Sequence, residues 1–132
     1  LVNTQQQDIG PSLLFITLPN VFQQAFGSVP LLSYGVSVLL KAGHLVNDEL
    51  IDIFYNHETE EVVELSARRI DTRNTHGTGC TLSSAFAAQL AKGLSLTEAA
   101  RAAKHYINQA IIHGAHHEIG HGHGPVAHFY KL

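Results

Sequence analysis

Short apolar runs occupy the first half of the chain, and each has the length of a strand. Residues 12–17 read SLLFIT and residues 36–40 read VSVLL. Continuous aliphatic and β-branched runs of this length are typical of strands that are buried on both faces. Residues 48–55 and 62–65 predict two further strands, separated by a polar turn at residues 56–61.

The second half of the chain predicts two helices. From Thr81 onward, apolar and small residues recur on one helical face, and Gly93 predicts the end of this helix. Ser95 followed by Glu98 three residues later matches the capping-box pattern at a helix start. The second helix is expected to run to about His113.

Other segments have weaker patterns. Residues 1–11 show no period, residues 21–34 favour helical structure that Gly35 would end, and Ile70 is expected to begin a short additional strand. The order of strands, loops and helices predicts an α/β domain.

Composition and charge narrow the classes of protein. The chain has 132 residues, of which 45% are hydrophobic and 14% charged, and such a composition indicates a folded domain. A net charge of -3 gives no support for a nucleic-acid or anionic-membrane partner, and no apolar run is long enough to cross a bilayer. The single cysteine, Cys80, and the polar N-terminus predict a cytoplasmic protein. Because the chain lacks methionine and begins with Leu1, we expect a fragment, a processed chain or a sequence with pieces missing.

The most informative stretch is HGTGC at residues 76–80, directly before the first predicted helix. Gly77 and Gly79 allow the backbone to approach a ligand, and the unpaired amides of a helix start attract anions. A phosphoryl group fits such an anion hole. A helix start also favours the thiolate form of a cysteine, so Cys80 is a candidate base. Taken alone, the motif is equally well explained as a glycine turn beside a structural cysteine.

Four motifs in order carry a family resemblance. The run at residues 74–93 is NTHGTGCTLSSAFAAQLAKG, and VLLKAGHL, AAKHYINQAI and GHGHGPVAHF lie at residues 38–45, 102–111 and 120–129. Together they resemble the hydroxymethylpyrimidine and phosphomethylpyrimidine kinases of the ribokinase-like superfamily. The resemblance implies a three-layer α/β/α sandwich of which this chain is the C-terminal half. Residues 1–132 would then be one incomplete domain, with residues 1–35 poorly matched.

The resemblance also implies a reaction. In these kinases ATP, with Mg²⁺, phosphorylates 4-amino-5-hydroxymethyl-2-methylpyrimidine and then its monophosphate, in thiamine biosynthesis. It suggests a homodimer, and no residue of this chain is assigned as a metal ligand. Cys80 matches the catalytic cysteine, Lys41 the lysine that neutralises the transferring phosphate, and Gly77, Thr78 and Gly79 the anion hole. The residues matched to nucleotide binding are Gly43, His44, Thr72, Asn74, Ala103 and Lys104.

Bland alternatives exist for several of these residues. The alternative for Lys41 is a solvated lysine at a strand end, and the alternative for His44 is a turn residue. For Thr72, Asn74 and His76 the alternative is that they brace the loop and do not contact a ligand. Packing explains Ala103 and Lys104 equally well.

The chain departs from the family pattern near its start. Thr17 and Asn20 resemble a family motif, but Leu18 is inserted and no glutamate follows, which removes an expected magnesium ligand. Ala42 also replaces a glycine. We therefore expect these 132 residues alone to bind ATP weakly and to turn over poorly.

Three other functions remain open. The first is a cysteine-type pyridoxal or pyridoxine kinase, whose HGTGC region is nearly the same. The second is an inactive fragment that acts as a binding module. The third is a metal site in the histidine-rich tail, which contains His113, His116, His117, His121, His123 and His128.

Overall fold

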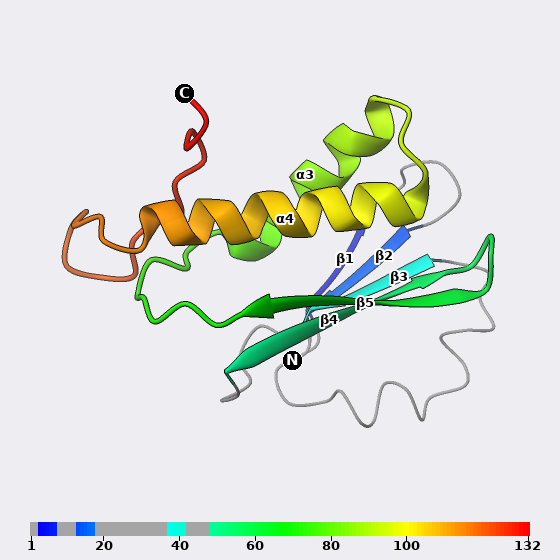
Figure 1. Cartoon of the computed structure of the whole chain (residues 1–132), viewed down its shortest axis with the longest axis horizontal. Helices are drawn as coiled ribbons and strands as arrows, with labels where there is room; N and C mark the ends of the chain where they lie inside the picture. Colours follow the sequence, from blue (N-terminus) through cyan, green and yellow to red (C-terminus); the bar gives the residue numbers. More distant parts are fainter. Residues whose placement is uncertain (1–2, 8–12, 18–36, 42–47) are drawn as a thin grey trace. The chain divides into compact units, whose positions relative to one another are not determined.

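The structure is a computed structural model that describes residues 3–7, 13–17, 37–41 and 48–132. The chain divides into two compact units, Leu1–Arg68 and Arg69–Leu132 (Figure 1). The first unit contains the strands and the second contains the helices.

The first unit is a five-stranded sheet whose strands lie side by side in chain order (Figure 1). Strands β2 and β3 are parallel, and every other neighbouring pair is antiparallel. The strands are β1 (Asn3–Gln7), β2 (Leu13–Thr17), β3 (Ser37–Lys41), β4 (Glu49–Asn56) and β5 (Glu61–Arg68).

The β4–β5 hairpin follows from its sequence pattern. In β5 the buried Val63 and Leu65 alternate with exposed residues, as expected for a strand with one covered face. The Oδ1 atom of Asn56 accepts a hydrogen bond from Glu58 N at 3.0 Å and so starts the turn. Glu60 completes the turn in the left-handed region, at φ 56°.

Four of the expected strands are confirmed, with ends that differ by a few residues. Strand β1 was missed, because its sequence NTQQQ has no hydrophobic alternation to reveal it. The strand expected at Ile70 is wrong: β5 ends at Arg68, which pairs with Glu49, the first residue of β4. Beyond that pair β4 offers no further partner. The helix expected in residues 21–34 lies outside the described residues.

The second unit is built on two packed helices, α3 (Thr78–Ala91) and α4 (Leu96–Gly114). Helix α3 buries Leu82 and Phe86 completely, and α4 buries a row of small residues that permits close approach. These are Ala99, Ala100, Ala103 and Ala110.

Both predicted helices are confirmed. Helix α3 starts at Thr78, three residues before the expected start, because the first turn needs no internal donor bonds and tolerates glycine. It ends as expected: Gly93 has φ 91°, and its amide donates to Leu90 O at 2.9 Å. Among the described residues, no helix has both the length and the apolar character needed to span a membrane.

Candidate active site

The start of helix α3 is open. Its N-cap is Gly77, at φ 82° and ψ 7°, which has no side chain to cap the helix, and the first turn contains no acidic residue. Thr81 N donates to Gly77 O at 2.9 Å and closes the first turn. The amides of Gly79 and Cys80 precede this bond, so helix geometry leaves them without an intrahelical acceptor. They combine with the positive end of the helix dipole to favour an anion.

Space around the two glycines is also open. Among the described residues, no atom would lie within 4 Å of a Cβ atom built on Gly77 or Gly79. Packing against these residues therefore does not require glycine at residue 79, whereas the positive φ of Gly77 favours glycine at residue 77. A ligand can reach the backbone amides of this turn.

Cys80 brings a nucleophilic atom to the same turn. It is a free, exposed cysteine in the first turn of α3. Its side chain lines a hollow of about 620 Å³ on the second unit. Among the other lining residues are Thr81, Tyr106, His128 and Lys131. A thiolate here would face solvent and any ligand held by the neighbouring amides.

The loop before α3 is tied to the end of α4. Thr72 Oγ1 donates to Ala115 O at 3.0 Å and accepts from Asn74 N at 3.1 Å. Asn74, only 7% exposed, donates through Nδ2 to Gly114 O and His117 O, both at 2.7 Å. These contacts fit the bracing alternative for Thr72 and Asn74, and their nucleotide-binding role stays a prediction.

The remaining predicted residues are dispersed. Lys41 ends β3 in the first unit and is half-buried, and residues 43 and 44 (Gly43 and His44) lie outside the described part of the chain. On α4, Ala103 is fully buried, which suits packing, and Lys104 is half-buried. The structure therefore brings Gly77, Thr78, Gly79 and Cys80 together, with Thr72 and Asn74 in the same unit.

Sequence reasoning missed two residues beside this turn. Thr81 Oγ1 and His128 Nε2 share a hydrogen bond of 3.0 Å, although they lie 47 positions apart. The motif GHGHGPVAHF drew attention to the tail, yet no local pattern pairs its histidine with Thr81.

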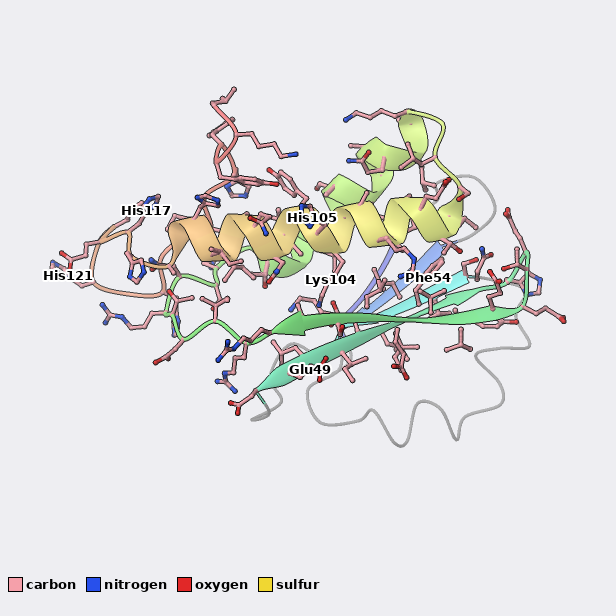
Figure 2. All side chains as sticks on the ribbon, viewed as in Figure 1. Glu49, Phe54, Lys104, His105, His117 and His121 are labelled. Atoms are coloured by element: carbon pink, nitrogen blue, oxygen red, sulfur yellow. The ribbon has the colours of Figure 1, made fainter. Side chains whose placement is uncertain are left out.

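The histidine-rich metal site gains no support. Figure 2 shows His117 and His121 on the loop that follows α4, and both are exposed. Within residues 48–132 and the described strands before them, no three His, Cys, Asp or Glu side chains gather closely enough to hold a metal ion.

Comparison with known sequences identifies relatives of the chain. Residues 23–127 match the family described as phosphomethylpyrimidine kinase. The chain is 54% identical over 95 residues to a hydroxymethylpyrimidine/phosphomethylpyrimidine kinase of Rhizobium meliloti, covering 72% of this chain and 35% of that protein. It is 41% identical over 94 residues to the kinase of the same name from Escherichia coli, and this match covers 71% of this chain and 35% of that protein. The chain thus spans about a third of the length of these relatives.

Solved structures give the same result for the fold. The chain resembles the pyridoxal kinase from Staphylococcus aureus in complex with AMP-PCP and pyridoxal, with a TM-score of 0.63 and 32% identity. The match covers 70% of this chain and 33% of that one. It confirms the predicted fold class, an incomplete ribokinase-like α/β fold.

Proposed function

Because the chain belongs to the phosphomethylpyrimidine kinase family, we propose that it forms the anion-binding, catalytic part of an ATP-dependent kinase. The proposed acceptors are 4-amino-5-hydroxymethyl-2-methylpyrimidine and its monophosphate, which places the protein in thiamine biosynthesis. The relatives named hydroxymethylpyrimidine/phosphomethylpyrimidine kinase support this choice of substrate.

One observation carries the proposal: the uncapped start of α3 has an exposed cysteine in its first turn. The open amides and open glycines suit a group that is rich in negative charge. In the transition state, the transferring phosphoryl group spreads negative charge over its equatorial oxygens. Preorganised N–H donors therefore stabilise the transition state more than they stabilise the bound reactants. Gly77, Thr78 and Gly79 would hold this group.

Cys80 would act as the general base. Its thiolate accepts the proton of the acceptor's hydroxymethyl group, and the hydroxyl oxygen forms a bond to the γ-phosphorus. The bond from that phosphorus to the β,γ-bridging oxygen breaks, and ADP leaves with the electron pair. ATP supplies the transferred group, and the second phosphorylation follows the same course with a phosphate oxygen as the acceptor.

The other assignments are weaker parts of the same proposal. Lys41 would supply a positive charge to the transferring phosphate, and Gly43, His44, Thr72, Asn74, Ala103 and Lys104 would border the nucleotide. For Mg²⁺, the described residues offer neither a cluster of ligands nor an acidic side chain in the first turn of α3. The described residues therefore do not fit a protein-held Mg²⁺ ion. A cytoplasmic homodimer remains a prediction.

A second candidate is a pyridoxal kinase. The observation in its favour is the structural likeness to the S. aureus enzyme, whose complex contains pyridoxal and AMP-PCP. Both candidates use the same anion hole and differ only in the acceptor. The relatives with the higher sequence identity favour the pyrimidine.

The proposal is tested by ATP-dependent phosphorylation of the pyrimidine and of pyridoxal, measured with C80A and C80S in a protein that carries this chain together with the rest of a kinase of this family. We expect pyrimidine turnover to fall about 10²- to 10⁴-fold in both variants, because a base is lost. H105A is the matched control, since His105 is an exposed histidine on α4 outside the site (Figure 2). Wild-type turnover of pyridoxal alone would favour the second candidate, and C80A with undiminished turnover would contradict the role of Cys80.

A further inference from the structure

The end of the chain, residues 124–131, is anchored on helix α4 and is called the tail segment below (Figure 1). Ala127 N donates to Ala110 O at 2.9 Å, and the hydroxyl of Tyr106 donates to His128 O at 2.8 Å. The Tyr130 ring lies 5.6 Å from that of Tyr106 and stacks on His113 at 5.2 Å. These contacts hold the backbone of His128 in place.

From this anchor the tail segment reaches both ends of the turn that contains Cys80. Before the turn, His76 N donates to Gly124 O at 3.1 Å, and His76 pairs with Pro125 in a parallel bridge. After the turn, the ring of His128 shares the 3.0 Å hydrogen bond with Thr81. Residues 77–80 therefore lie between two contacts made by one segment.

The contact before the turn has a close fit. Gly124 is buried, and a Cβ atom placed on it would overlap the side-chain amide of Asn74. Asn74 in turn is bonded to the carbonyls of Gly114 and His117. Any larger residue at position 124 would push the tail segment away from the loop.

The contact after the turn is made by Thr81, whose amide closes the first turn of helix α3. Thr81 is 8% exposed, and its amide makes the first intrahelical hydrogen bond, to Gly77 O. Helix α3 has no side-chain cap of its own. Holding Thr81 therefore holds the orientation of the Gly79 and Cys80 amides just before it.

We propose that the tail segment positions the anion hole and that His128 is its principal positioning residue. The inference rests on the proposed function, because it assumes that the α3 start binds an anion. His128 lines the same hollow as Cys80. Its role is to fix the donors around the phosphoryl group through Thr81, without touching the reacting atoms.

Cys80 provides a direct probe, since it is the sole cysteine of the sequence. We would measure its alkylation by iodoacetate and by iodoacetamide and take the ratio of the two rates. Both reagents need an accessible thiolate, so the ratio isolates the attraction of the site for a carboxylate. N-acetylcysteine amide supplies the ratio for a free thiol.

We expect the wild-type ratio to exceed that of the free thiol, and H128A and T81V each to lower it about two- to fivefold. The double variant should lower the ratio no further than either single variant, because both substitutions remove the same hydrogen bond. H128Q, which keeps a polar group near the same place, should restore most of the ratio. I119A, which alters a side chain that is 57% exposed and lies outside the tail segment, should leave the ratio unchanged.

The outcomes separate the two proposals. A wild-type ratio equal to that of the free thiol contradicts the anion hole, and the inference fails with it. A raised ratio that survives both H128A and T81V contradicts the positioning role alone. Helical content and thermal unfolding are measured for each variant. If H128A does not fold, T81V alone tests the positioning role, because valine keeps the volume of threonine.

Discussion

The two helices of the second unit begin in opposite ways. Helix α4 has a complete capping box: Glu98 N donates to Ser95 Oγ at 3.4 Å, and Ser95 N donates to Glu98 Oε2 at 3.1 Å. Helix α3 begins at Gly77, with no side-chain cap and no acidic residue in its first turn. One helix start is closed by its own side chains, whereas the other leaves the amides of Gly79 and Cys80 without an intrahelical acceptor.

The difference agrees with the proposed anion site at the start of α3. Glycine at an N-cap is less stabilising than serine by only a few tenths of a kcal/mol, so the start of α3 is slightly less stable than that of α4. Glycines leave space at this end, and a cysteine stands beside it. The start of α3 is thus both less stabilised than that of α4 and the position of the candidate site. This agrees with the general observation that functional sites are often less stable than the rest of a protein.

The largest expected effect comes from adding a negative charge at the start of α3. G79D places a permanent carboxylate in the first turn, where the open space accommodates a side chain and φ is not positive. The carboxylate should stabilise the helix by about 0.3–1 kcal/mol while competing with the phosphoryl group for the same amides. We expect kinase turnover to fall at least about tenfold while the unfolding temperature rises.

G79N is the matched control for this prediction, because asparagine has nearly the same shape without the charge. It should lose less activity than G79D and gain less stability. Equal turnover in G79D and the wild type would show that no anion binds at this helix start.

The two helix starts also show how far sequence reasoning reaches. The capping box could be predicted because Ser95 and Glu98 are three residues apart and their interaction is local. The glycine turn and Cys80 were likewise evident from adjacent residues. The contact of Thr81 with His128 could not be predicted, because it depends on how the tail returns along α4 over a separation of 47 residues.

The same distinction applies to the sheet. Strand β3 was predicted from its apolar run, whereas β1 is polar and is defined by its backbone pairing with β2. The two predicted catalytic residues show a further limit of sequence reasoning: Cys80 lies in α3, but Lys41 belongs to the other unit. Residue type and motif order predicted both as catalytic. The structure explains the position of Cys80, in the first turn of a helix, and does not address the role of Lys41.

A smaller effect is expected from opening the closed start of α4. S95A removes the side-chain acceptor for Glu98 N and should lower the free energy of unfolding by about 1 kcal/mol. Kinase turnover should not change, since the first turn of α4 is not part of the candidate site. Denaturant unfolding and the kinase assay on the same preparation check both statements.

S95G sharpens the test, because glycine is itself a tolerated N-cap and should cost only a few tenths of a kcal/mol. If S95A and S95G were both as stable as the wild type, the capping box would contribute nothing to the free energy of unfolding. A loss of turnover in S95A at full folding would connect α4 to the site in a way the two helix starts do not suggest.

The smallest effect concerns the pH dependence of that cap. Hydrogen bonds from the side chain and then the backbone of Ser95 hold the pKa of Glu98 below its usual value of 4.5. A carboxyl group whose pKa is lower in the folded state adds stability above its unfolded pKa and loses it as the pH falls through the folded pKa. The stability difference between the wild type and E98Q should therefore be largest near neutral pH and shrink below about pH 4.5. Denaturant unfolding of both proteins across this range measures the difference. In the S95A background the pH dependence should become smaller but remain, because the backbone amide of residue 95 still donates to Glu98. A difference that stays constant into acid would mean that the Glu98 carboxylate is not held by Ser95.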